Sequence, residues 1–329
     1  MSSAGIIANP ASGKDIRRLV AHGSTVDNNE KINMVRRTLL SLDALGVERV
    51  YYMPDTYAIV PRAAAPVALR LELEALPMVV LGAPSDSLEA ARRLADLGAA
   101  CIVVLGGDGT NRLVAAGSGD VPLVSISTGT NNVFPRMVES TLAGLAAGLV
   151  ATGAAIAAQA VRRAPRLDVY VDGEQRDQAL IDVATSHQAW IGARALWDVA
   201  QLSEIVLSRV TPSEIGLCSL GGLLFPRAVG RQHGAYIAIG PGERTVLAPL
   251  APGLIRRVPV ATARLLAPGE RVTLRGERCT IALDGEREID IVRPGHHLEV
   301  ALNPRGPRVV DIAAALQAGA AGGAFDAAT

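Results

Sequence analysis

The chain has 329 residues, enough for roughly two domains of about 150 residues each. Its 49% hydrophobic and 19% charged residues are typical of a globular protein, and with only 3% aromatic residues the core must be aliphatic. The 32 basic and 32 acidic residues give a formal net charge of zero, which argues against a large positive surface for nucleic acid or an anionic membrane.

The N-terminus and the cysteines predict a cytoplasmic protein. Residues 1–9 lack a basic segment followed by a long apolar run, so we expect no signal peptide. The apolar stretch at residues 141–161 is rich in Ala and Gly and has polar breaks, so we expect no membrane span. Cys101, Cys218 and Cys279 are far apart, which argues against a disulfide framework or a zinc site. We interpret them as small core residues in a reducing compartment.

The first half of the chain alternates predicted strands and helices. Apolar, β-branched runs predict strands at residues 5–9, 49–53, 78–82, 101–106 and 122–127. Apolar residues at helical spacing predict a helix over residues 28–45 that ends at Gly46. A second helix is predicted over residues 85–98, with Ser85 and Asp86 as N-cap candidates. Strands that alternate with helices indicate βαβ units, so we expect a parallel sheet.

Beyond about residue 160 the pattern changes to short strands separated by Gly and Pro. These strands are predicted at residues 167–174, 179–186, 235–240, 271–277, 279–286 and 288–295. Their alternation of apolar and polar residues is typical of an antiparallel sheet. Asp-Gly pairs at 172–173 and 284–285 are hairpin signals. Helices are predicted over residues 193–208 and 311–320, and the second would let the chain return to the first domain.

The strongest local signal for chemistry is the segment VVLGGDGTNRLVAAG at residues 103–117. An apolar strand there runs into the turn Gly106–Thr110, and a helical pattern follows. Such a turn brings backbone N–H groups and a helix N-terminus close to phosphate oxygens, and its glycines let the backbone approach without a Cβ. Asp108 in this turn could bind Mg²⁺ or accept a proton from a hydroxyl. The alternative is a tight βα turn in which Asp108 caps the helix.

Two further polar loops follow predicted strands. NPASGK begins at Asn9 and follows the first predicted strand. STGTNN, at residues 127–132, follows the fifth predicted strand. Each alone could be an ordinary polar loop. Neither familiar phosphate motif fits, because Arg112 stands where the dinucleotide fingerprint needs glycine and Ala8 and Asp15 break the P-loop pattern. However, α/β folds place ligands at the carboxyl ends of parallel strands, so three polar loops at one sheet edge favour a nucleotide site.

In their order and spacing, NPASGK, GGDGT and STGTNN resemble the superfamily that unites NAD kinases with diacylglycerol and sphingosine kinases. The resemblance is greatest to its ATP-NAD kinase-like branch, which includes the acetoin-catabolism X proteins, and it covers most of the chain. It implies an α/β plus all-β fold. A three-layer, Rossmann-like nucleotide-binding domain would span residues 1–155, joined by about residues 305–329. A β-sandwich on the acceptor side would span residues 156–304.

The resemblance also implies roles for individual residues. Asp108 would be catalytic, and its turn would hold the nucleotide phosphates and the metal. Asp284 and Glu286 become catalytic candidates that act on the acceptor hydroxyl or its metal, with a plain hairpin turn as the alternative. The implied nucleotide-binding residues are Asn9, Gly106, Gly107, Gly109, Thr110, Thr130, Asn131 and Asn132. The implied ligands are ATP and Mg²⁺.

One segment differs from the NAD kinase pattern. NAD kinases carry an Asn-Glu pair in an apolar strand that contacts the second nucleotide, and Ile181 and Asp182 stand at those positions here. An unpaired carboxylate is costly to bury, so Asp182 is a candidate acceptor-binding residue, with pairing to a protein partner as the alternative. His187, Trp190 and Arg194 could line the acceptor pocket, although tryptophan more often packs in a core.

These observations predict ATP-dependent phosphoryl transfer to a hydroxyl, with NAD as the leading acceptor and NADP as the product. Such a transfer relies on positioning, Mg²⁺ and a carboxylate near the nucleophile rather than on covalent catalysis. Two alternatives stay open: a kinase for another small-metabolite or lipid hydroxyl, and a nucleotide-binding regulator without turnover. We expect a nucleotide and a small-molecule acceptor as partners, no nucleic acid, no membrane span and, by analogy, a homodimer.

Overall fold

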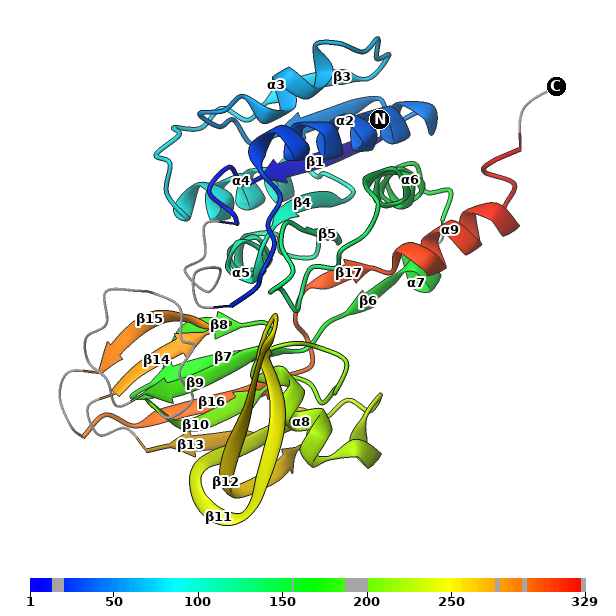
Figure 1. The fold of residues 1–329 in the computed structure, drawn as a ribbon. Helices are drawn as coiled ribbons and strands as arrows, with labels where there is room; N and C mark the ends of the chain where they lie inside the picture. The colour runs from blue at the N-terminus through cyan, green and yellow to red at the C-terminus, as the bar shows by residue number, and fades with distance from the viewer. Residues whose placement is uncertain (14–20, 156, 187–200, 276–278, 292–294, 327–329) are drawn as a thin grey trace.

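The chain folds into a parallel-sheet region and an antiparallel-sheet region, drawn at the top and bottom of Figure 1. The computed structural model describes residues 1–13, 21–155, 157–186, 201–275, 279–291 and 295–326. No helix within these ranges has the length and apolar character needed to cross a membrane.

Among the described residues, seven strands form the sheet of the parallel-sheet region, in the order β3-β2-β1-β4-β5-β17-β6. They are β1 (Ser3–Ala8), β2 (Arg49–Tyr52), β3 (Glu72–Ala75), β4 (Ile102–Gly106), β5 (Leu123–Ser127), β6 (Val161–Arg163) and β17 (Arg308–Val310). Neighbouring strands are parallel except β6, which pairs antiparallel with β17. The strand order reverses direction between β1 and β4, so the loops that follow these two strands begin side by side.

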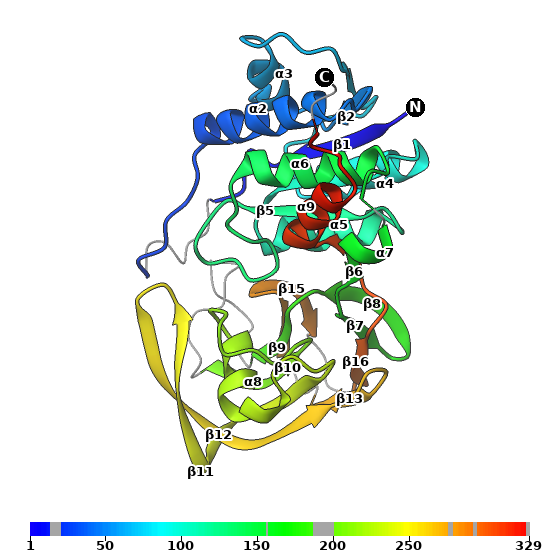
Figure 2. The ribbon, with the colours of Figure 1, turned by 90° about the vertical axis from the view of Figure 1, so that its right-hand side faces the viewer.

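Helices cover both faces of this sheet and give the region three layers (Figures 1 and 2). On one face lie α2 (Asn28–Ala44), α3 (Ile59–Ala64), α6 (Ser140–Ala151) and α9 (Ile312–Ala321). On the other face lie α4 (Ser85–Asp96) and α5 (Asp108–Gly117). The short α7 (Ala157–Ala160) precedes β6 and contacts α9.

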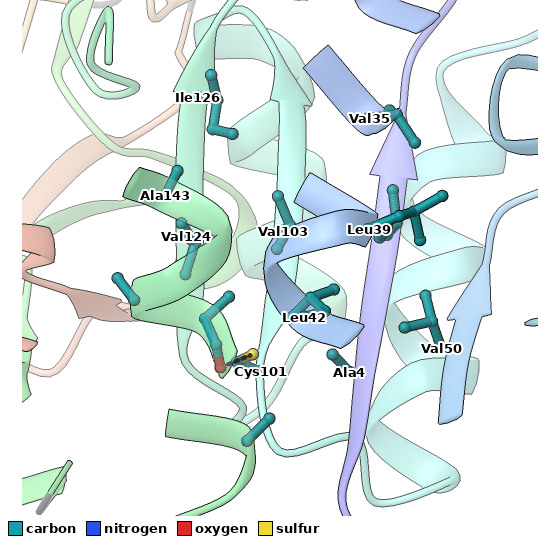
Figure 3. Close-up of a cluster of buried hydrophobic side chains, with 14 of the residues drawn as sticks. Ala4, Val35, Leu39, Leu42, Val50, Cys101, Val103, Val124, Ile126 and Ala143 are labelled. Atoms are coloured by element: carbon teal, nitrogen blue, oxygen red, sulfur yellow. Dashed lines mark hydrogen bonds between the residues drawn. The ribbon is translucent and has the colours of Figure 1, made fainter. Parts of the chain in front are cut away.

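The core beneath α2 and α6 is aliphatic, as the composition requires. Leu39 of α2 packs over the sheet with Val103 of β4, and both are fully buried (Figure 3). Cys101 lies in the same cluster, where its Sγ donates to the carbonyl of Ala147 at 3.4 Å. Burial raises the pKa of the Cys101 thiol to about 12, so the thiol stays protonated. All three cysteines are free and buried, which confirms their interpretation as core residues.

In the part of the second region that the structure describes, the strands form two antiparallel sheets. The six-stranded sheet has the order β12-β11-β10-β9-β14-β15 and the four-stranded sheet the order β13-β16-β7-β8. The strands are β7 (Arg166–Val171), β8 (Glu174–Ala179), β9 (Asp182–Ser186), β10 (Leu202–Leu207), β11 (Gly234–Ala251), β12 (Leu254–Leu266), β13 (Arg271–Leu274), β14 (Cys279–Leu283), β15 (Glu286–Ile291) and β16 (Leu298–Asn303). Val169, Val183 and Ile281 belong to a core shared by both sheets, as in a sandwich.

Strands β11 and β12 continue beyond the sheet as a long ribbon. Residues 240–243 of β11 are bulged out of the pairing with β12, because Ile239 and Arg244 both pair with Val260. We call the part beyond the bulge, residues 244–260, the β11–β12 arm; its tip turns towards the parallel-sheet region in Figure 2. The arm shares a core with α8 (Cys218–Leu224), and the 3-10 helix η2 (Pro226–Ala228) follows α8.

The fold confirms the predicted class, but the predicted strand at residues 78–82 is wrong. Strand β3 lies earlier in the chain and pairs with β2 at the sheet edge, where its charged residues can face water. Val79 and Leu81 are 78% and 69% exposed. The Asp86 carboxylate accepts the N–H groups of residues 81–83, which makes this stretch a loop around the start of α4.

The predicted helix at residues 193–208 is also wrong where it can be compared. Residues 202–207 form β10, which pairs with β9 and β11, while residues 193–200 lie outside the described ranges. A short apolar run fits both helical and strand spacing, so periodicity alone could not decide. Pairing on both sides selects the strand.

The end of the chain returns to the parallel-sheet region through β17 and α9. Short β6, which begins after residue 155, also joins that sheet. The domain limits proposed at residues 155 and 304 stay predictions. The Asp-Gly pairs form hairpin turns as predicted. Asp172 and Asp284 both have φ 53°, and the glycine after each also has positive φ.

Candidate functional site

The three polar loops meet at the carboxyl edge of the parallel sheet. Ala8 of β1 pairs with Leu105 of β4, which brings the loop after β1 beside the GGDGT turn (Gly106–Thr110). Asn9 Nδ2 then donates to Thr110 Oγ1 at 2.9 Å. The STGTNN loop (residues 127–132) follows β5, the other neighbour of β4. The juxtaposition expected from the strand order is therefore present.

A buried lysine supports the loop after β1. Lys31 of α2 is 1% exposed, and its Nζ donates to the carbonyls of Asn9 at 3.0 Å and Ser12 at 2.8 Å. It also donates to Asn28 Oδ1 at 3.1 Å. Our sequence reasoning missed Lys31, although its position directly before the apolar face of the 28–45 helix was a signal.

Close packing explains two glycines of the GGDGT turn. A Cβ on Gly106 would lie 2.6 Å from the Thr110 Cβ. A Cβ on Gly107 would lie 2.9 Å from Asn132 Oδ1 in the STGTNN loop. Any side chain at either position would push these neighbours away. The turn therefore keeps its backbone close to Thr110 and Asn132, at the start of α5.

Asp108 links the start of α5 to the residues that follow the STGTNN loop. Its side chain is buried, and its Oδ1 accepts the N–H groups of Val133 at 3.0 Å and Phe134 at 2.8 Å. These charge-assisted hydrogen bonds fix the loop relative to the helix N-terminus. Asp108 thus lies in the predicted site and has at least a positioning role there.

The STGTNN loop is stabilised from within and from outside. Asn132 Nδ2 donates to Ser127 Oγ at 2.8 Å and to the Gly129 carbonyl at 3.2 Å. Thr130 is exposed, and its N–H donates to the Ser24 carbonyl at 3.0 Å. Asn131 is half-buried beside it. Thr130, Asn131 and Asn132, three of the predicted nucleotide-binding residues, thus lie on a loop held by hydrogen bonds.

Asp284 organises a turn in the antiparallel-sheet region. Its side chain is fully buried, and its Oδ1 accepts the N–H groups of Leu180 at 3.0 Å, Ile181 at 2.7 Å and Asp182 at 3.3 Å. Burial raises the pKa of Asp284 to about 6, although these N–H groups and the nearby Arg112 favour the charged form. Asp284 therefore holds the segment that carries Asp182.

This raised pKa predicts a measurable pH dependence of stability. The folded chain binds the Asp284 proton more tightly than the unfolded chain, so the resulting stability is present below about pH 4 and lost as pH rises through about 6. Relative to Asp284→Asn, the wild-type free energy of unfolding should fall by on the order of 3 kcal/mol between about pH 4 and 7. Chemical denaturation at several pH values measures this difference. Parallel profiles for the two proteins would contradict it.

Glu286 is the carboxylate that reaches the GGDGT turn from the antiparallel-sheet region. A Cβ on Gly109 would lie 3.2 Å from Glu286 Oε2 and 3.3 Å from Oε1. The carboxylate therefore packs against the first turn of α5, and the candidate site is built from both regions. Asp182 is 6% exposed at the start of β9, bonded through its N–H to Asp284.

A second contact between the regions is an ion pair of a buried arginine with a half-buried aspartate, which sequence reasoning missed. Arg112 of α5 has a 4% exposed side chain, and its Nη1 lies 3.0 Å from Asp177 Oδ2 of β8. Its Nε lies 4.0 Å from Asp284 Oδ2. In the sequence Arg112 was informative only as a mismatch to a glycine motif. Its position one helical turn after Asp108 was the available signal.

Comparisons with known proteins match both regions of the chain. Residues 4–154 match the ATP-NAD kinase N-terminal domain, and residues 165–305 match the acetoin catabolism protein X C-terminal domain. The chain is 42% identical to acetoin catabolism protein X of Cupriavidus necator, across 95% of this chain and 91% of that protein. The chain belongs to the acetoin catabolism protein X family. Its first domain is of the NAD kinase type, which supports a phosphotransferase.

Solved structures offer a more distant comparison. One is described as "a putative diacylglycerol kinase" from Bacillus anthracis str. Sterne, with 11% identity and a TM-score of 0.49 over 94% of this chain and 96% of that one. A second structure with the same description and source has 14% identity and a TM-score of 0.43 over 94% and 98% of the two chains.

The site of this acetoin catabolism protein X family member fits Mg²⁺ brought with a nucleotide. Among the described residues, no group of three or more His, Cys, Asp or Glu side chains could hold a metal by itself. In kinases Mg²⁺ needs only one or two carboxylates, because phosphate oxygens and water supply the other ligands. Asp108 at the start of α5 and Glu286 beside Gly109 are two such carboxylates. His187, Trp190 and Arg194 lie outside the described residues.

Proposed function

We propose that the chain is an ATP-dependent kinase that transfers a phosphoryl group to a hydroxyl, with NAD as the leading acceptor and NADP as the product. One observation carries the proposal: the Glu286 carboxylate of the antiparallel-sheet region lies against Gly109 of the GGDGT turn. Direct phosphoryl transfer needs a phosphate-binding turn and a carboxylate at the same point. Here the two come from different regions of the chain. A cytoplasmic location and a homodimer stay predictions.

The GGDGT turn would hold the ATP phosphates through backbone N–H groups and the N-terminus of α5. Asp108 at the start of α5 would hold Mg²⁺, and the ion supplies charge neutralisation on the phosphates. The predicted nucleotide-binding side chains would surround the nucleotide: Asn9, Thr110, Thr130, Asn131 and Asn132. Gly106 and Gly107 would let the phosphates approach the backbone.

The acceptor hydroxyl would approach from the antiparallel-sheet region. Glu286 is the better-placed group to orient or deprotonate it, because its carboxylate lies beside Gly109 of the GGDGT turn. Asp284 would then be a positioning residue for the segment with Asp182, our candidate for acceptor binding. Asp108 would have a similar role for the STGTNN loop, besides its catalytic one.

A different small-molecule hydroxyl is the second candidate acceptor. Two observations favour it over NAD. Ile181 and Asp182 replace the Asn-Glu pair of NAD kinases, and the relative from Cupriavidus necator is named for acetoin catabolism. A lipid hydroxyl is a third candidate acceptor, and a nucleotide-binding regulator without turnover is the candidate function outside the kinases.

The decisive experiment is ATP- and Mg²⁺-dependent phosphorylation of NAD, followed by coupled NADP detection. We expect turnover that Asp108→Asn lowers by at least about a hundredfold, because the substitution removes the charge but keeps an amide oxygen for the loop. Asp86→Asn is the matched control, since Asp86 also binds backbone N–H groups at a helix start but lies on α4.

Each outcome of this assay selects one function. NADP formation that Asp108→Asn strongly lowers and Asp86→Asn does not would establish the NAD kinase. ATP binding without NADP formation would move the proposal to the second acceptor class, tested by ATP consumption with a panel of hydroxyl metabolites and lipids. ATP binding without turnover on any acceptor would support the regulator. A chain that binds no ATP would refute the kinase proposal.

A further inference from the structure

The tip of the β11–β12 arm touches the parallel-sheet region next to the candidate nucleotide site. The His22 N–H donates to the Pro252 carbonyl at 2.9 Å. Gly253 follows in the turn with φ 74°, and a Cβ on it would lie 2.7 Å from His22 Cδ2. Figure 2 shows the tip (yellow) at the segment before α2 (blue). Only glycine fits here without moving the imidazole.

From His22 the chain continues along the STGTNN loop. Ser24 N–H donates to Thr130 Oγ1 at 2.8 Å, and the Val26 N–H donates to the Thr128 carbonyl at 3.0 Å. A Cβ on Gly23 would lie 3.7 Å from Thr130 Oγ1 and 3.8 Å from Pro252 Cγ. The arm tip, residues 22–26 and the STGTNN loop are therefore stacked in contact.

The arm is built to keep this shape. In the bulge at its base, a Cβ on Gly242 would lie 2.2 Å from the Val260 carbonyl oxygen, so the bend depends on glycine. Ala248 and Val258 are fully buried in the core formed with α8. The arm is thus fixed to the antiparallel-sheet region at its base and contacts the parallel-sheet region at its tip.

We propose that the Pro252–Gly253 turn is a positioning element for nucleotide binding. By docking on His22 it holds residues 24–26 against the STGTNN loop and keeps Thr130 in place for the nucleotide. The antiparallel-sheet region thereby contributes to a nucleotide site on the other region without touching the phosphates. This inference rests on the proposed function, because the ligand of the STGTNN loop is taken to be ATP.

The chain contains a matched control for the turn. Leu-Ala-Pro-Gly occurs twice, ending at Gly253 and at Gly269, and both glycines have positive φ. A Cβ on Gly269 would meet nothing within 4 Å. Gly253→Ala and Gly269→Ala therefore add similar backbone strain, but only the first displaces His22. We expect Gly253→Ala to raise the Kd of a non-hydrolysable ATP analogue by about threefold to tenfold, and Gly269→Ala by less than about twofold.

A second substitution separates docking from strain in the turn. His22→Ala removes the imidazole that the new Cβ meets but leaves the backbone N–H that binds Pro252. The double variant His22→Ala with Gly253→Ala should bind the ATP analogue within about twofold of wild type. Equal Kd values for wild type and Gly253→Ala, or no rescue in the double variant, would overturn the proposal.

Hydrogen exchange tests the contact without a ligand. The Val26 N–H bonds to the Thr128 carbonyl and the Thr130 N–H to the Ser24 carbonyl, so both join residues 24–26 to the STGTNN loop. Gly253→Ala should therefore speed the hydrogen exchange of these two N–H groups, and Gly269→Ala should not. Unchanged exchange in Gly253→Ala would overturn the positioning element even if wild type bound no nucleotide. Absent ATP binding in wild type would instead refute the proposed function. Faster exchange with an unchanged Kd would overturn the role in nucleotide binding.

Discussion

Replacing Glu286 by Gln should lower kcat by about 10²- to 10⁴-fold and change the Kd of ATP by less than about threefold. The amide has nearly the shape of the carboxylate but cannot accept the proton of the acceptor hydroxyl. Because Glu286 packs on Gly109, the isosteric amide should leave the GGDGT turn in place. Steady-state kinetics on the acceptor found in the assay above, with ATP binding measured by calorimetry, separate the two effects.

The chain again supplies a matched control. A second Asp-Gly-Glu hairpin ends at Glu174, where Asp172 has the same φ of 53° as Asp284. Glu174 is exposed, and no described contact joins it to the GGDGT turn, so Glu174→Gln should leave kcat within about twofold of wild type. Equal kcat losses in Glu286→Gln and Glu174→Gln would show that Glu286 takes no specific part in the chemistry. A large rise in the Kd of ATP for Glu286→Gln alone would make it a nucleotide ligand instead.

The meeting of the three loops could be predicted from the sequence because it follows from the order of elements. Buried apolar runs such as residues 101–106 identified parallel strands, and parallel strands deliver their following loops to one edge. Asn9 and Thr110 therefore had to be neighbours if β1 and β4 were adjacent. The Asp-Gly pairs were equally local signals, since a positive φ at Asp284 is a property of the turn itself.

Contacts between the two regions could not be predicted in this way. The family resemblance identified Asp284 and Glu286 as one motif, yet their carboxylates have different surroundings. One binds backbone N–H groups of residues 180–182, and the other packs on Gly109. That difference depends on how the β14–β15 hairpin docks on α5, which residue periodicity does not describe. The Pro252–Gly253 contact with His22 is of the same kind.

Arg112→Met should destabilise the chain by about 3 to 5 kcal/mol, the cost of breaking a buried pair by removing one partner. The Arg112 side chain is 4% exposed, and its loss leaves the fully buried Asp284 carboxylate without its nearby cation. Arg163→Met is the control, because Arg163 pairs with Asp120 at 2.6 Å but both side chains are exposed. That surface pair should contribute less than about 1 kcal/mol. Urea denaturation of both variants measures the difference.

A second substitution shows whether Arg112 acts through Asp284. If the cost comes from the uncompensated carboxylate, adding Asp284→Asn to Arg112→Met should destabilise by less than the sum of the two single variants. Additive free energies would instead assign the effect to Asp177, the other partner at 3.0 Å. Energetic coupling between Arg112 and Asp284 would also have a catalytic consequence. Arg112 on the GGDGT helix and Asp284 beside Glu286 would then form one buried link between the phosphate turn and the acceptor carboxylate, so loosening it should lower kcat even where the chain stays folded.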